Sequence, residues 1–368
     1  MVGKKIGARI GNKYEIKDVI THRDREVSVY VATDIETQEE VALKLSYAVD
    51  RIKLEAAFYK DSIQDLEGFP RKKWFGVAYG ARKKYIYGAL ALDRLGPTLD
   101  NLMEESKFGL KTTLQVMDQV ITRIQTLHER HIVHRGIKPD NFCIGPRGSK
   151  TESKVYMIDF DLSKAYVTSD GSHIDDEDEC GGNKYWTSLA VDQGHEGVRR
   201  DDMESAGYLA VYLLQGYLPW FTEYNNSGVS ARRCKAGTKL VELCMDLPKE
   251  LSTYFTYCRS LDFKQQPDYD YCRGLFRKVF EREGFRDDGV YDWVAPESVV
   301  EDPESLEDQQ SSGDSQTSDQ SEEECSSVPP SCDDNTAEHA LASQPKTTEA
   351  CPVEHLDMQW RQIAKIRR

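Results

Sequence analysis

The pattern of hydrophobic and polar positions divides the chain into a strand-rich part followed by a helix-rich part. Apolar residues alternate with polar ones in the first part, which predicts β-strands at 14–20, 27–31, 41–45 and 85–92. Helical patterns are found at 51–64, 114–128 and, in almost wholly apolar form, 203–218. We therefore expect an α+β fold with a β-rich N-terminal lobe over 13–93 and an α-helical C-terminal lobe over 97–295.

The composition changes abruptly after Trp293. Residues 297–352 are rich in Ser, Glu, Asp, Gln and Pro and contain almost no aromatic residues. Such a segment buries too little apolar surface to offset the conformational entropy of ordering it. The sequence thus predicts an extension over 1–12, one folded domain over 13–295 and a disordered acidic tail over 296–368.

The tail carries two further patterns. Ser318 and Ser321 precede acidic residues, which is typical of acid-directed phosphorylation sites, and the phosphates could dock near Lys184. An inert, solvated tail is the alternative. Residues 356–368 place apolar side chains near one helical face among basic ones. We expect this basic amphipathic segment to bind a partner protein, an acidic lipid surface or the folded domain itself.

The formal net charge of −15 is unevenly distributed. Residues 301–350 hold 14 of the 63 acidic residues and only one of the 48 Lys and Arg residues, so the remaining chain is close to neutral. The acidity therefore describes the tail rather than the folded part. Nucleic acid is not among the partners we expect.

The nine cysteines show no Cys-x-x-Cys spacing, so the sequence predicts no zinc site. The N-terminus lacks the apolar core of a signal peptide, and no run of 18 apolar residues is long enough to span a bilayer. We expect a chain of the cytoplasm or nucleus with free thiols.

Four segments carry chemistry in a recognisable order. Residues 134–142 read His-Arg-Gly-Ile-Lys-Pro-Asp-Asn-Phe, and residues 159–161 read Asp-Phe-Asp. Upstream, residues 41–44 read Val-Ala-Leu-Lys, and Glu55 lies on the helix that follows. These segments resemble the catalytic loop, the D-F-G motif and the V-A-I-K strand of protein kinases. The resemblance implies a two-lobed protein kinase fold with ATP and Mg²⁺ as ligands and proteins as substrates or partners.

Further segments resemble the casein kinase 1 family of Ser/Thr protein kinases over roughly residues 13–294. They are Leu-Gly-Pro-Thr-Leu at 95–99, Lys-Pro-Asp-Asn-Phe at 138–142, Arg-Arg-Asp-Asp-Met-Glu-Ser at 199–205, Leu-Pro-Trp at 218–220, Cys-Arg-Ser-Leu at 258–261, Pro-Asp-Tyr at 267–269 and Tyr-Asp-Trp at 291–293.

The resemblance assigns a role to each charged residue of a nucleotide site. Lys44 matches the lysine that contacts the α- and β-phosphates, and Glu55 the glutamate that pairs with it. Asp159 and Asn141 match the Mg²⁺ ligands, and Lys138 matches the lysine that contacts the γ-phosphate. The remaining nucleotide-binding positions are Val29, Ala42 and Leu95.

The main departure from this pattern is Gly136. Kinases carry an aspartate here, which orients the substrate hydroxyl and accepts its proton. Glycine offers no carboxylate, and loss of a general base typically costs about 10²–10⁴ in rate. Asp140 and Asp161 are the nearest acidic residues that could replace it.

Three other departures lie close to the same site. The turn at 21–28 has no glycine and is expected not to close over phosphates as a glycine-rich loop does. Asp161 replaces the D-F-G glycine and adds negative charge beside Asp159, which repels a triphosphate unless a metal lies between them. Gly182 stands where the family has a threonine that bonds the catalytic aspartate.

Other positions keep the family pattern. Tyr59, His134 and Phe160 match residues that stack into a spine joining the lobes, while Arg135 and Asp202 match residues that brace the catalytic loop. Lys184 matches an arginine that binds phosphorylated or acidic substrate. Nearby basic residues either complete that anion pocket or form a plain basic surface; they are Arg232, Arg233 and Lys235.

Two functions remain open from the sequence. The first is a casein kinase 1-like pseudokinase, a signalling scaffold or allosteric regulator whose ATP binding is retained or lost. The second is a divergent, active Ser/Thr kinase that transfers the γ-phosphate of ATP to acidic or phospho-primed proteins, because the loose transition state needs little help from a base.

Overall fold

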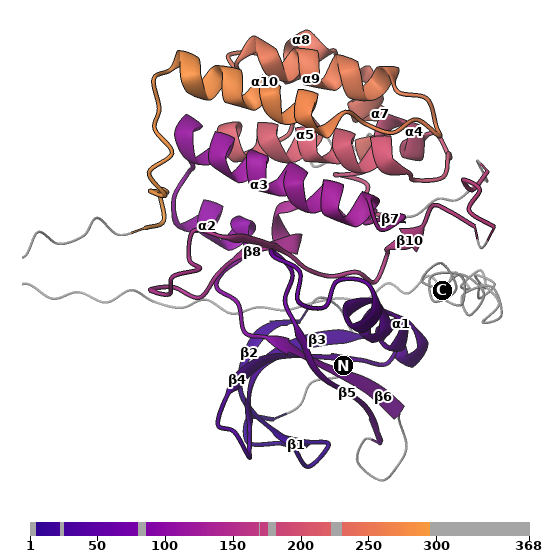
Figure 1. Cartoon of the computed structure of the whole chain (residues 1–368), viewed down its shortest axis with the longest axis vertical. Helices are drawn as coiled ribbons and strands as arrows, with labels where there is room; N and C mark the ends of the chain where they lie inside the picture. The colour runs from indigo at the N-terminus through magenta and orange to yellow at the C-terminus, as the bar shows by residue number, and fades with distance from the viewer. Residues whose placement is uncertain are drawn as a thin grey trace, which may run out of the picture. The chain divides into compact units, whose positions relative to one another are not determined.

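The computed structural model describes residues 5–22, 26–79, 86–168, 170–175, 182–221 and 230–294. The predicted acidic tail and the middle of the glycine-free turn lie outside these residues. The described residues form a β-rich N-lobe and an α-helical C-lobe (Figure 1), which confirms the predicted fold class.

The N-lobe is a six-stranded antiparallel sheet in the order β1-β2-β3-β4-β6-β5. Its strands are β1 (Arg9–Ile10), β2 (Tyr14–His22), β3 (Val27–Asp34), β4 (Glu40–Ser46), β5 (Lys72–Tyr79) and β6 (Ile86–Asp93). The four predicted strands are confirmed. Strand β1 pairs with β2, so the sheet begins within the segment predicted as an extension, and β5 was not predicted.

Alternation along the strands gives the sheet two different faces. On β3 and β4, Tyr30, Leu43 and Leu45 are buried in a core on one face of the sheet. Their neighbours Val29 and Ala42 line the opposite face, which borders a cleft. Helix α1 (Val49–Asp61), predicted at 51–64, packs against β5 and β6.

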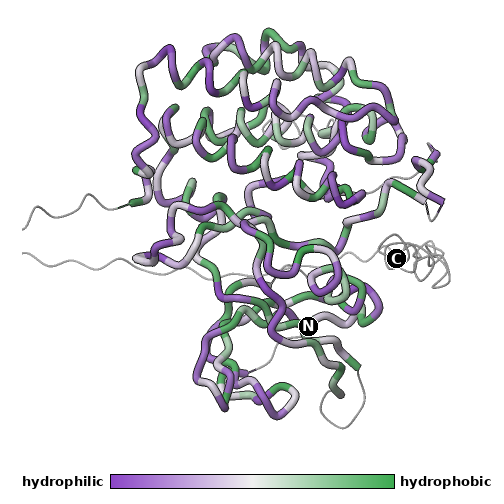
Figure 2. The backbone as a smooth tube through the Cα atoms, in the orientation of Figure 1, coloured by the Kyte–Doolittle hydropathy of each residue, from purple (hydrophilic) through white to green (hydrophobic). Residues whose placement is uncertain are grey.

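The C-lobe is built around α3 (Leu110–His128), which packs against α5 (Arg199–Gln215) and α10 (Tyr269–Arg282). The other helices are α2 (Leu99–Glu105), α4 (Leu189–Asp192), α7 (Ala231–Gly237), α8 (Leu240–Leu243) and α9 (Lys249–Ser260). Figure 2 shows green and purple alternating along these helices, as expected for elements with one buried face.

Helix α5 begins and ends earlier than the sequence pattern predicted. Asp201 accepts a hydrogen bond from the Val198 N–H over 2.8 Å, which fixes the start of the helix. Gly216 adopts a φ of 81° at the other end, a left-handed conformation that stops the helix before the apolar pattern ends at 218.

One apolar cluster joins the lobes through Phe160. Its ring centroid lies 5.1 Å from those of Tyr59 and His134, and 4.6 Å from that of Phe58. The predicted spine is therefore confirmed. It fixes α1 against the segment that follows β9 (Val155–Met157), and so sets the positions of Glu55 and Asp159.

No helix among the described residues is long and apolar enough to cross a membrane. The five described cysteines are free thiols, and the described part of the chain holds no cluster of three or more metal-ligating side chains.

Candidate active site

A cleft of about 880 Å³ is lined by strands β2, β3 and β4, by the segment 92–98 and by β8 (Phe142–Ile144). Val29, Ala42 and Leu95, the three predicted apolar contacts, all line it. Lys44, Glu55 and Asp159 lie at the same cleft. Its volume and mixture of apolar walls with a few charged groups are typical of a small-molecule site.

The ammonium of Lys44 is buried between two carboxylates. Its Nζ lies 2.7 Å from Glu55 Oε2 and 2.7 Å from Asp159 Oδ1. Burial alone would lower the pKa of Lys44, but Asp159, Glu55 and Asp161 together raise it well above its ordinary value. The lysine is therefore a fixed positive charge inside the cleft.

Negative charge exceeds positive charge around this lysine. Burial raises the pKa of Glu55 above its ordinary value, and Asp159 and Asp161 raise it further against the opposing effect of Lys44. Glu55 and Asp159 thus contact the same ammonium, and Asp161 adds further negative charge nearby. The described residues form no group of three or more metal-ligating side chains, so a divalent cation here would need further oxygen ligands, such as those of a phosphate group.

The catalytic loop is held by one buried carboxylate. Asp202 accepts the backbone N–H groups of His134 and Arg135 over 2.7 and 2.8 Å, and also contacts His128 Nε2 at 3.0 Å. Burial alone would raise the pKa of Asp202, but these partners hold it below its ordinary value. The predicted bracing of the loop is confirmed.

Two residues of the site adopt strained backbone conformations. Arg135 has a φ of 64° and Asp159 a φ of 70°, both left-handed and unusual for residues other than glycine. Such strain persists only where the surroundings fix it, and it concentrates at functional sites. Here it turns Asp159 toward Lys44.

Gly136 keeps the backbone contacts of an ordered loop. Its N–H donates to His134 Nδ1 over 3.2 Å, and its carbonyl accepts from Asn141 Nδ2 over 2.7 Å. His134 Nε2 in turn contacts the Ile158 carbonyl at 3.2 Å. Since Nδ1 accepts, His134 is the neutral Nε2-protonated form, in agreement with burial lowering its pKa.

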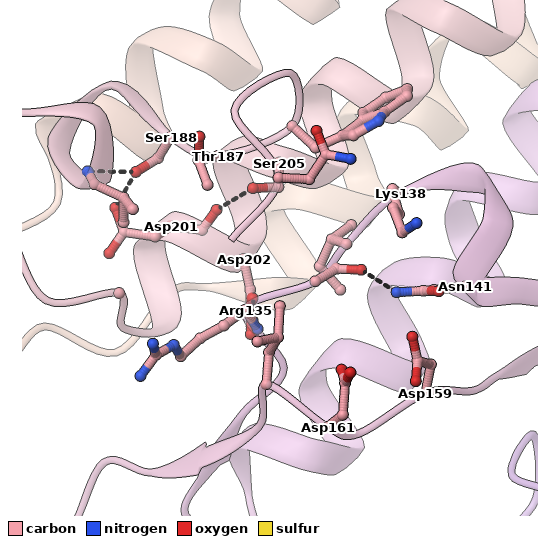
Figure 3. Close-up of a pocket in the computed structure, with 17 residues that line it drawn as sticks. Arg135, Lys138, Asn141, Asp159, Asp161, Thr187, Ser188, Asp201, Asp202 and Ser205 are labelled. Carbon is pink, nitrogen blue, oxygen red and sulfur yellow. Dashed lines mark hydrogen bonds between the residues drawn. The ribbon is translucent and has the colours of Figure 1, made fainter. Parts of the chain in front are cut away.

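A second cavity of about 170 Å³ borders Gly136, and we call it the loop pocket (Figure 3). Lys138, Asn141, Asp159 and Asp161 are among the residues that line it. Of the two acids that could replace the missing aspartate, Asp161 lines the loop pocket. Asp140 lines the cleft instead, 3.3 Å from the Lys138 ammonium.

The two unusual glycines differ in the space around them. A Cβ on Gly136 would meet its nearest atoms, His134 Nδ1 and Asn141 Nδ2, at 3.2 and 3.3 Å. A Cβ on Gly182 would lie 2.7 Å from Thr187 Cγ2, and its φ of 106° disfavours any side chain. A Cβ therefore fits at 136 after a small adjustment, whereas any side chain at 182 would be strained.

The suggestion that Lys235 belongs to an anion pocket is wrong. Its fully buried ammonium donates to the carbonyls of Lys184 and Thr187 over 3.0 and 2.6 Å, and pairs with Asp192 at 2.8 Å. Two of its N–H groups are thus used by carbonyl oxygens, and Asp192 balances its charge. Lys235 thus holds residues 184–187 in place, and Arg232 also lies near Asp192, at 3.5 Å.

Two residues of the site were missed from the sequence. Cys143 lines the cleft, but all three residues of β8 are apolar and buried, so no alternation marked it in the sequence. Buried Glu196 pairs with Arg135 at 2.9 Å and with Lys164 at 3.1 Å. No sequence signal pointed to that carboxylate.

The two-lobed fold, the buried lysine–glutamate pair and the braced loop together define a protein kinase-like domain. A family model described as protein kinase domain matches residues 26–265. The chain belongs to the protein kinase family. Domains of this family in general bind ATP and Mg²⁺ and act on proteins.

Proposed function

We propose that this protein is a casein kinase 1-like pseudokinase, which binds ATP with a divalent cation and serves as a signalling scaffold or allosteric regulator. One observation carries the proposal: the Lys44–Glu55–Asp159 contacts are complete, while the adjacent catalytic loop has Gly136 in place of a carboxylate. The parts needed to hold a nucleotide remain, and the part that accepts a proton is lost.

The nucleotide would lie in the cleft. Val29, Ala42 and Leu95 offer apolar walls for a flat base, and Lys44 offers a fixed positive charge for phosphate oxygens. Asp159 and Asn141 are the residues that would hold Mg²⁺, which neutralises phosphate charge when bound. The excess of carboxylates over cations makes nucleotide binding depend on that metal.

The proposed casein kinase 1 subfamily is supported by the contacts of its signature segments. Asp201, from the Arg-Arg-Asp-Asp segment, accepts from Ser188 Oγ over 2.5 Å and so ties α5 to the segment after the catalytic loop. Asp292, from the Tyr-Asp-Trp segment, accepts the Gly109 N–H over 2.6 Å at the start of α3. These segments stabilise the C-lobe.

A thermal-shift titration with ATP tests the proposal, with and without Mg²⁺ or Mn²⁺. We expect the melting temperature to rise by a few degrees only when metal is present, because a ligand stabilises the state that it binds. The same titration on Lys44→Ala gives the baseline. Equal shifts in both proteins, or no shift in either, would reject nucleotide binding at this cleft.

The alternative function is slow phosphoryl transfer to proteins. It is favoured by the Lys44–Glu55 pair and by the position of Asp159, because both arrangements are required in active kinases. Incorporation of phosphate into an acidic or phospho-primed peptide should then exceed that of a Lys44→Ala, Asp159→Ala double variant. Equal incorporation would eliminate this alternative.

A further inference from the structure

The loop pocket lies where Gly136 lacks a side chain. Its far wall includes Thr187 and Ser188, from the segment before α4, and Ser205 on α5, as Figure 3 shows. These hydroxyl groups already donate within the wall, to Asp192, to Asp201 and to the Asp201 carbonyl respectively. The far wall is therefore fixed by its own hydrogen bonds.

Lys138 gives the pocket a cation with donors to spare. Its side chain is only 18% exposed, and its ion-pair partner among the described residues is Asp140, at 3.3 Å. An ammonium has three N–H groups, so Lys138 can still donate to an anion in the pocket.

The carboxylates that line the pocket are mostly engaged elsewhere. Asp202 accepts two backbone N–H groups, Asp201 accepts from Ser188 and Val198, and Asp159 pairs with Lys44. Asp159 and Asp161 nevertheless repel a further anion, and this repulsion falls when a divalent cation binds beside them. Occupation of the pocket by an anion should therefore be coupled to metal binding.

We propose that the loop pocket binds a carboxylate supplied from outside the chain, which occupies the place of the missing aspartate side chain. The ligand is either a small free carboxylate or an aspartate or glutamate side chain of a bound protein substrate. The cavity of about 170 Å³ is open to such a group, and Lys138 supplies the charge that receives it.

The bound carboxylate would act as a proton acceptor. As a substrate hydroxyl oxygen forms its bond to the γ-phosphorus of ATP, the bond from that phosphorus to the β,γ-bridging oxygen breaks and ADP leaves. The hydroxyl proton passes to the carboxylate. This activity rests on the proposed nucleotide binding, whereas binding of the carboxylate does not.

The binding test uses sodium formate at constant ionic strength, with sodium chloride as the reference and Mg²⁺ present. We expect formate to raise the melting temperature of the full chain by about 2 °C at saturation. Gly136→Asp and the matched Gly136→Asn fill the pocket from within, and Lys138→Met removes its cation, so none of the three should respond. A formate shift of equal size in all four proteins, or in none, would overturn the proposal.

The activity test measures phosphate transfer from ATP to a serine peptide. Formate should increase the rate of the unmodified protein at least about tenfold, part of the 10²–10⁴ that a general base contributes. It should leave Gly136→Asp unchanged. A peptide pair with Glu or Gln beside the serine distinguishes the two sources, since only the Glu peptide would react without formate.

The two failures are distinguishable. An ATP-dependent thermal shift without any formate or Glu-peptide effect would overturn the pocket proposal and leave nucleotide binding intact. A formate shift without an ATP shift would support the pocket and reject the proposed nucleotide site.

Discussion

The Lys44 ammonium on β4 and the Glu55 carboxylate on α1 lie 2.7 Å apart. Among the described residues that line the cleft, no other ion pair joins this strand to this helix. The pair joins the sheet to α1 and leaves Lys44 a second contact with Asp159 in the other lobe. Loss of the lysine would leave the two buried carboxylates of Glu55 and Asp159 without this cation.

We predict that Lys44→Met destabilises the folded domain by about 3–5 kcal/mol, the usual cost of removing one partner of a buried ion pair. Chemical denaturation measures this cost. Lys111→Met is the matched control, because Lys111 pairs with Asp288 at the surface and its loss should cost about 1 kcal/mol or less. Similar losses in both variants would contradict the buried position of Lys44.

Gly136 and Gly182 should respond differently to substitution. Gly136→Ala should cost less than about 1 kcal/mol, because its new Cβ needs only a small adjustment. Gly182→Ala should cost about 1–3 kcal/mol, because it combines a contact of 2.7 Å with a left-handed backbone. Urea denaturation of the two variants tests the order, and a reversed order would refute the geometry.

Lys235→Met should destabilise the protein by about 2–4 kcal/mol, because it removes the buried ammonium that pairs with Asp192 and donates to two carbonyl groups. The exposed neighbour Arg233 provides the control, and Arg233→Ala should change stability by less than about 0.5 kcal/mol. Equal stability losses in Lys235→Met and Arg233→Ala would indicate that Lys235 is a surface cation.

Acid should weaken the fold through its buried histidines. Burial lowers the pKa of His134 and of His128 below the ordinary value of 6.5. Below pH 6.5 the unfolded chain therefore takes up protons that the folded chain does not, and the free energy of unfolding falls with pH. The stability that these two neutral histidines contribute is fully present above pH 6.5, and it is lost as the pH falls through their lowered pKa values.

Melting temperatures between pH 8 and pH 5 test this dependence. His134→Phe keeps a ring against Phe160 but cannot be protonated, so its stability should fall less steeply below pH 6.5 than that of the unmodified protein. Parallel curves for the two proteins would show that His134 does not contribute to the acid sensitivity.

The sequence predicted which residues meet, but not how firmly each is held. Lys44, Glu55 and Asp159 could be placed together because their spacing matches known motifs, and their side chains do meet. The burial of Lys235 could not be foreseen, since a basic residue among basic neighbours has the same pattern at a surface. Only the fold brings Asp192 and the carbonyl groups of 184 and 187 around it.

Backbone conformation is a second feature that could not be predicted from the sequence. Gly136 and Gly182 both replace a residue of the family pattern, an aspartate and the threonine that bonds it, and the sequence alone does not distinguish their backbone conformations. The structure separates them, because position 182 requires a positive φ while position 136 does not. Strand β5 was missed for another reason: Lys72, Lys73, Trp74 and Phe75 give two polar residues followed by two apolar ones, and the register is irregular between Lys72 and Trp74, so the segment shows no alternation.

A single-turnover reaction measures nucleotide binding and phosphate transfer by this protein together. Excess protein is mixed with γ-labelled ATP, Mg²⁺ and the serine peptide that has Gln and no acidic residue beside the serine, and bound and transferred label are counted from the same sample. The proposed function predicts that the ATP is bound yet recovered intact, with transfer no greater than in the Lys44→Ala, Asp159→Ala double variant. Transfer to this peptide clearly above that variant, without added formate, would show that the protein is an active kinase.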